Sequence, residues 1–193
     1  MTGARLSRIV LNVADVERAR GFYRDALGFE EGGYGTMQLG AQEVGVELIE
    51  AHGASYPRDC RSSDLWFQHF AIAVDDMDAA YARLVRHPDF QPITRDGPQR
   101  LPPNTGSVVA FKFRDPDGHP LELLYGRGLA QGVDHSAIAV SDVERSIAFY
   151  SQVLGLSVIG RSLNRGVEQA RLDDLEDPVV DVVALGSARS VET

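Results

Sequence analysis

The sequence predicts an α+β protein built from repeated units, each with one strand, one helix and then two or three strands. The first observation is an internal repeat, because residues 13–30 and 140–157 are identical at nine of 18 positions. The second is the order of patterns within each copy: an alternating β-branched run precedes a run with apolar residues at helical spacing. A looser copy in the middle of the chain brings the number of predicted units to three.

The first unit shows the pattern most clearly. Residues 6–13 alternate and are rich in β-branched side chains, which is typical of a strand. Asp15 is placed to cap a following helix, and Gly28 ends that helix. Residues 36–39 and 44–49 are then predicted as two further strands.

The second unit is expected at residues 66–126 and the third from residue 133 onward. A shared spacing aligns all three, because one residue in each predicted first strand precedes the helix-capping aspartate by seven positions. These equivalent residues are Arg8, His69 and His135. In the second unit, a stretch at residues 87–106 holds five prolines and is predicted to be a long irregular loop of the kind that often covers a site.

His69 and Glu122 are the two most informative candidates for a functional site. Strand alternation places His69 on a face of small residues, opposite the bulky apolar face. In the run LELL, alternation places Glu122 on the face opposite Leu121 and Leu123. A carboxylate buried there is costly unless a metal ion, a cation or hydrogen bonds compensate it.

Composition narrows the function classes. Hydrophobic residues make up 44% of the chain and the net charge is −9, which argues against general nucleic-acid binding. The single cysteine, Cys60, excludes an internal disulfide and a cysteine-cluster metal site. No run approaches the roughly 20 apolar residues of a membrane span, and the start of the chain lacks a signal-peptide pattern. We therefore expect a cytoplasmic protein that binds neither membranes nor nucleic acids.

Three motifs carry a family resemblance: FYRDALGF at 22–29, FYSQVLGL at 149–156 and DPDGHPLELL at 115–124. With the aspartate-anchored repeats, they resemble the vicinal oxygen chelate superfamily of glyoxalase I, extradiol dioxygenases, and fosfomycin- and bleomycin-resistance proteins. The resemblance covers most of the chain. It implies βαβββ modules, two of which pair so that their sheets curl around one pocket, with metal ligands from the first strand (His) and last strand (Glu) of each module.

The resemblance also implies a domain organisation. The first two modules are expected to pair in a domain at residues 1–127, and residues 128–193 to form a third module that is unpaired within the chain. Either the third module pairs with its copy in a second chain, giving a homodimer with one His135 from each chain, or this chain is a shortened form of a longer protein. Asp181 lies in the predicted last strand, and Glu192 lies close to the family's last-strand glutamate.

Carried over position by position, the resemblance gives Arg8 and Glu47 in the first module and His69 and Glu122 in the second. His135 holds the ligand position of the third. Arg8 departs from the family pattern, because a guanidinium has no lone pair to donate. Glu47, His69 and Glu122 could still hold a divalent ion, with Fe, Mn, Zn, Ni and Mg all possible. Alternatively, Arg8 pairs with one of the two glutamates in place of a metal.

The leading hypothesis is a glyoxalase- or dioxygenase-like enzyme that acts on a small oxygen-bearing organic substrate. A metal would act as Lewis acid and stabilise an enolate or oxyanion, with Glu47 or Glu122 as base. The first alternative is a metal-free protein that sequesters a small molecule, with Arg8 binding an anionic substrate. The second alternative is a module kept for assembly, with the third repeat as a dimerisation surface.

Overall fold

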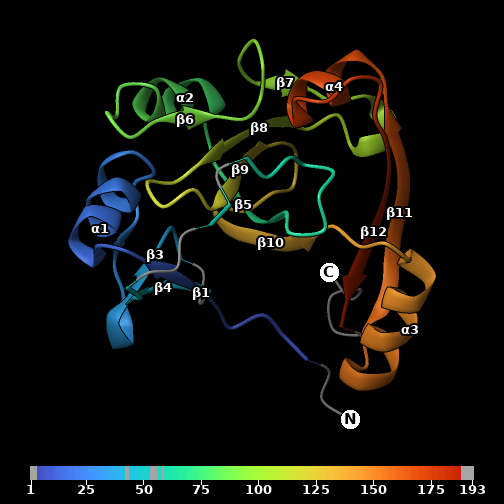
Figure 1. Ribbon diagram of the computed structural model, residues 1–193, viewed down its shortest axis with the longest axis horizontal. Coiled ribbons are helices and arrows are strands. Elements are labelled where there is room, and N and C mark those ends of the chain that lie inside the picture. The colour runs from blue at the N-terminus through green and yellow to red at the C-terminus, as the bar shows by residue number, and fades with distance from the viewer. Residues whose placement is uncertain (1–3, 42–43, 53–55, 58, 188–193) are drawn as a thin grey trace.

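The computed structural model describes residues 4–41, 44–52, 56–57 and 59–187. It contains three successive modules, each of which begins with a strand and a helix (Figure 1). The expected α+β class, made of βαβββ-type modules, is confirmed.

The first module forms a four-stranded sheet with the order β1-β4-β3-β2, in which β1 and β4 are parallel. The side chain of Asp15 accepts a hydrogen bond from the Arg18 amide, which caps α1 as the sequence predicts. The elements of this module are β1 (Arg8–Val13), α1 (Val16–Asp25), β2 (Glu30–Glu31), η1 (Gly33–Gly35), β3 (Thr36–Gln38) and β4 (Gly45–Glu50).

The second module repeats this plan with a longer insertion. Its elements are β5 (Gln68–Ala73), α2 (Met77–Leu84), β6 (Gln91–Pro92), β7 (Gln99–Arg100), η2 (Pro103–Thr105), β8 (Val109–Arg114) and β9 (Pro120–Tyr125). The predicted irregular loop at 87–106 therefore contains two short strands and one 3-10 turn. Both short strands pair with β8, so the insertion is tied to the sheet edge.

The third module consists of β10 (Gly132–Ile138), α3 (Val143–Leu154), β11 (Ser157–Arg165), α4 (Val167–Asp173) and β12 (Val179–Gly186). Its strands are divided between two sheets. β11 and β12 form a separate antiparallel pair that stands at one side of the molecule (Figure 1), whereas β10 joins the sheet of the second module.

The pairing of modules differs from the expected one. The sheet of the second module has the order β10-β5-β9-β8-β6, and β10 runs antiparallel to β5. The strands of the first two modules lie in separate sheets, and the third module, expected to be unpaired within the chain, adds β10 to the sheet of the second module. The physical reason is that β9 occupies one edge of β5, and the short connection at 126–131 lets the chain turn back and place β10 on the other edge. The proposed domain boundary between 127 and 128 remains a prediction.

The first two modules are joined by their cores rather than by a sheet. The rings of Phe22 in α1 and Phe113 in β8 lie 6.4 Å apart, and both are fully buried in one cluster that spans the two modules. Arg83 of α2 donates to the carbonyl of Ala26, and Tyr23 donates to Asp115. This packing uses the outer, bulky face of the second sheet and leaves its small-residue face for other contacts.

Candidate metal site

The strand register places the equivalent residues of the first two modules in equivalent positions. Glu47 lies opposite Val10 in the β1–β4 pair, and Glu122 lies opposite Ala71 in the β5–β9 pair. Arg8 precedes Val10 by two residues, as His69 precedes Ala71. The equivalence of Arg8 and His69 that the seven-residue spacing predicts is therefore confirmed.

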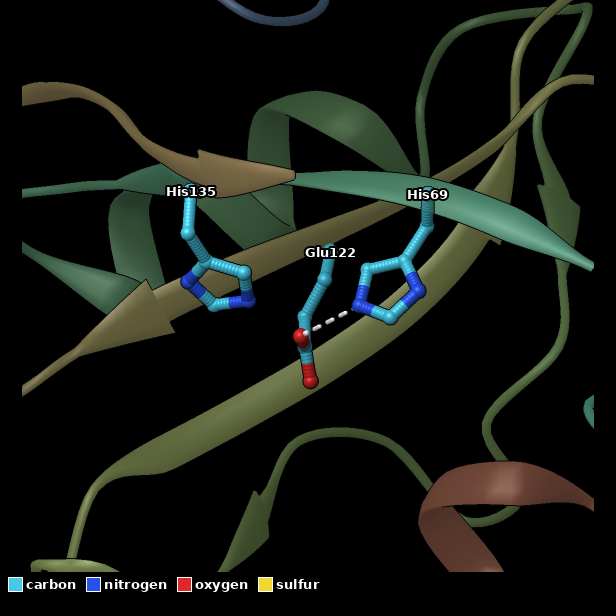
Figure 2. A group of neighbouring side chains, drawn as sticks. All are labelled: His69, Glu122 and His135. Carbon is cyan, nitrogen blue, oxygen red and sulfur yellow. Dashed lines mark ion pairs between the residues drawn. The ribbon is translucent and has the colours of Figure 1, made fainter. Parts of the chain in front are cut away.

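Three strands bring one side chain each to a common point above the small-residue face. In the register, Ala71 of β5 lies between His135 of β10 and Glu122 of β9, and His69 lies two residues earlier on the same face. Ala71 is fully buried, and its single methyl group leaves space for the larger neighbours to meet above it. Figure 2 shows the side chains of His69, Glu122 and His135 converging from these strands.

The three side chains form a compact group. One possible ligand atom from each lies within 4.8 Å of those of the other two. His69 Nε2 and Glu122 Oε2 are 3.2 Å apart, and the rings of His69 and His135 have centroids 6.0 Å apart. Leu121 and Leu123 lie on the opposite face in the core, as alternation predicts.

Glu122 is a buried carboxylate that stays charged. Burial raises its pKa, but the ammonium of Lys112 and the hydrogen bond to His69 outweigh this effect and lower the pKa to about 2. Burial lowers the pKa of His69 in spite of the nearby Glu122, so this imidazole is held neutral. A charged carboxylate and a neutral imidazole are the forms that bind metal ions.

His135 is oriented by its neighbour in the sequence. Its Nδ1 lies 2.7 Å from Asp134 Oδ2, which leaves the other ring nitrogen, Nε2, free to bind a metal ion. Burial lowers the pKa of His135, but the hydrogen bond to Asp134 and the charge of Glu122 raise it above its usual value overall. A carboxylate on the second ring nitrogen is the common arrangement around metal-binding histidines.

The residues present fit a divalent metal ion. Two imidazoles and one carboxylate are the donor set of non-haem Fe(II) sites and also suit Zn and Mn. Their possible ligand atoms lie close enough together for one ion to bind all three, and three protein ligands would leave coordination positions open for a substrate. His69, Glu122 and His135 would hold the ion.

Glu47 does not belong to this group. Its Oε2 pairs with Arg8 Nη1 at 2.6 Å, and the two side chains are 27% and 52% exposed. The structure does not bring Glu47, His69 and Glu122 together, since Glu47 pairs with Arg8 in another sheet. The alternative expectation was an ion pair of Arg8 with one of the two glutamates. The first module contains such a pair, between Arg8 and Glu47.

The remaining candidates lie elsewhere. Asp181 of β12 forms a two-bond ion pair with Arg161, and Glu192 lies outside the described residues. His135 lies beside His69 and Glu122 of its own chain, and the expected pocket with one His135 from each of two chains stays a prediction. A homodimer remains a prediction.

Sequence reasoning missed a buried ion pair beside Glu122. Lys112 of β8 lies opposite Glu122 in the β8–β9 register, and its Nζ is 2.6 Å from Asp173 Oδ1 in α4. A signal for Lys112 was available, because the alternation of the run FKF puts the lysine on the face opposite Phe111 and Phe113. The sequence carried no comparable signal for Asp173.

Comparison with known families gives a match over most of the chain. The sequence model described as Glyoxalase/Bleomycin resistance protein/Dioxygenase superfamily matches residues 5–123 and 132–185. The two matched ranges include all three residues of the group, His69, Glu122 and His135. None of the described helices has the length and apolar character needed to cross a membrane.

Several curated proteins are similar to this chain. A probable chloroplastic lactoylglutathione lyase of Arabidopsis thaliana is 28% identical over 163 residues, which cover 80% of this chain and 45% of that protein. A lactoylglutathione lyase of Oryza sativa is 27% identical over 80% of this chain and 55% of its own length. The uncharacterized protein YaeR of Escherichia coli is 31% identical over 131 residues, covering 62% of this chain and 94% of YaeR. The chain thus spans about half the length of the lyases it matches.

Among solved structures, glyoxalase I from Zea mays superposes with a TM-score of 0.64 at 23% identity. The superposition covers 93% of this chain and 67% of the maize chain. At this identity the likeness shows the fold alone.

Proposed function

This chain belongs to the Glyoxalase/Bleomycin resistance protein/Dioxygenase superfamily, and on that premise we propose that it is a divalent-metal-dependent enzyme of the glyoxalase type. The observation that carries the proposal is the convergence of His69, Glu122 and His135 within 4.8 Å of one another. The similarity to lactoylglutathione lyases supports a lyase reaction over a dioxygenase reaction.

The substrate class follows from these relatives and from the coordination positions that three protein ligands would leave free on an ion. We infer a small organic molecule with two neighbouring oxygens, such as the adduct of an α-ketoaldehyde with a thiol. A bound divalent ion would supply a Lewis acid able to stabilise negative charge on the substrate oxygens.

The residues of the chain have separate roles in this proposal. His69 and His135 hold the ion from strands β5 and β10, and Asp134 fixes the ring of His135. Glu122 is the carboxylate ligand and also the candidate base, because it is the carboxylate of the group and remains ionised. Glu47, the other base considered from the sequence, is paired with Arg8 and does not support that role.

The test compares two matched variants, Glu122→Gln and Glu47→Gln, with the wild type. We expect the wild type to carry about one Fe, Mn, Zn, Ni or Mg ion per chain by elemental analysis and to convert a methylglyoxal–thiol adduct. Glu122→Gln should lose the ion and at least about 100-fold in activity, since even outer-shell changes cost about 10- to 100-fold. Glu47→Gln should keep both.

Two outcomes would contradict the proposal. One is a wild-type chain that retains no divalent ion after exposure to each of these metals. The other is equal loss of metal from both variants. A metal-free wild type that binds small molecules with unchanged affinity in a chelator would instead favour the sequestering function.

A further inference from the structure

A buried ion pair lies beside His69, Glu122 and His135, on the small-residue face of the second module's sheet. Lys112 Nζ lies 2.6 Å from Asp173 Oδ1, and the side chains are only 10% and 4% exposed. Gln169 Nε2 donates to the second carboxylate oxygen of Asp173 at 2.6 Å. Both oxygens of Asp173 are therefore engaged, and its charge is directed toward Lys112.

Lys112 lies directly beside the carboxylate of the group. It is the cross-strand partner of Glu122 on β8 and β9, and such partners have Cβ atoms about 5 Å apart. Its neighbours Phe111 and Phe113 point into the core on the other face. The lysine thus projects on the same side as His69 and Glu122, so its positive charge acts on the place where an ion would sit.

Asp173 is held in position by contacts that do not involve Lys112. The hydroxyl of Thr94 donates to the carbonyl of Leu172 at 3.0 Å, and the amide of Arg95 donates to the carbonyl of Arg171 at 2.9 Å. Leu172 is buried in one apolar cluster with Ala71 and Ala110 of the sheet. The third module therefore fixes a negative charge over the sheet of the second module.

These charges oppose one another around a divalent ion. Glu122 attracts the ion, Lys112 repels it, and Asp173 reduces that repulsion by neutralising Lys112. In a buried site such charges are poorly screened by salt. The third module contributes both a ligand, His135, and the charge that balances the lysine.

We propose that the Lys112–Asp173 pair sets the affinity of the His69–Glu122–His135 site for its divalent ion. Lys112 is a positioning residue that shares the charge of Glu122 and lowers the affinity, and Asp173 is the counter-charge that limits this effect. The inference rests on the proposed function, because it needs the ion, and it adds the two residues that tune the binding of that ion.

The test is a double-mutant cycle on the 193-residue chain, stripped with a chelator and titrated calorimetrically with Mn²⁺ and, in parallel, with Zn²⁺. Lys112→Met should tighten binding about tenfold, and Asp173→Asn should weaken it about tenfold. The double variant, with two neutral side chains, should bind within a few-fold of the wild type. Opposite shifts separate an electrostatic role from a structural one, because loss of folding weakens binding in every variant.

Arg18→Met is the matched control. It also removes one positive charge from an ion pair, with Asp89, but this pair joins the first two modules and includes none of His69, Glu122 and His135. Its dissociation constants should equal those of the wild type. Circular dichroism spectra check that each variant is folded, and if Lys112→Met alone does not fold, Asp173→Asn and the double variant still decide the outcome.

Each result has a distinct meaning. Suppose that the wild type binds the ions, but that both single variants shift the affinity in the same direction or that Asp173→Asn does not shift it. Either result overturns this inference and leaves the proposed function standing. A wild-type chain that binds neither ion overturns the proposed function and this inference with it.

Discussion

In the first module, Arg8 and Glu47 occupy the strands β1 and β4; in the second, His69 and Glu122 occupy the same positions on β5 and β9. The backbone register is the same in both. In the first module the two side chains form an ion pair that is largely open to solvent. In the second they are buried and face a third possible ligand, His135.

Two physical differences separate these regions. The first is chemical, because arginine stays protonated and can only donate, whereas histidine offers a lone pair. The second is the neighbouring strand. β10 covers the free edge of β5 and brings His135, whereas β1 ends its sheet among the described residues. A shared fold position therefore becomes a candidate metal site only when a neighbouring module completes and buries it.

The largest effect on stability is expected at the buried carboxylate, in acid. The pKa of Glu122 in the folded chain is about 2, below its ordinary value of 4.5. Its contribution to stability is therefore present above pH 4.5 and is lost as the pH falls toward 2, because the unfolded chain takes up the proton first. This shift corresponds to about 3 kcal/mol of unfolding free energy.

Urea unfolding of the wild type and of Glu122→Gln, both in chelator, measures this effect. The difference between their unfolding free energies should shrink steadily between pH 5 and pH 3, since groups that do not contact Glu122 titrate in the same way in both chains. A difference that stays constant over this range would mean that Glu122 is not held ionised by Lys112 and His69.

The smallest effect is expected at the exposed pair of the first module. Arg8→Ala should lower the unfolding free energy by less than about 1 kcal/mol, because ion pairs at this exposure contribute little. Thermal unfolding in low and moderate salt would measure it, with the wild type showing a correspondingly weak salt dependence. A loss of several kcal/mol would indicate that the first pair is as tightly coupled to its surroundings as the second.

Local patterns predicted the faces of the strands and the equivalence of residues. Alternation placed Glu122 opposite two core leucines, and the seven-residue spacing aligned His69 with His135. These inferences succeed because they depend only on strand and helix periods. The choice of edge for β10 depends on long-range hydrogen bonding, which no local pattern encodes. The sequence therefore did not predict that His135 lies beside His69 and Glu122 of its own chain.

The position of Asp173 in α4 is harder to predict from local sequence patterns. Asp173 reaches Lys112 across 61 positions in the chain, and the register of a seven-residue helix against a sheet is set by packing. Lys112 itself could have been noticed, since a lysine between two core phenylalanines has to face the other side of its strand. Its partner could only be found in the folded chain.

The most direct test of the central claim is to locate the ion by anomalous diffraction from crystals grown or soaked with Mn²⁺ or Zn²⁺. We predict one strong peak within about 2.0–2.4 Å of His69, Glu122 and His135, and none beside Arg8 and Glu47. A peak beside Glu47, or ligation that leaves out His135, would contradict the claim that the second and third modules together build the site.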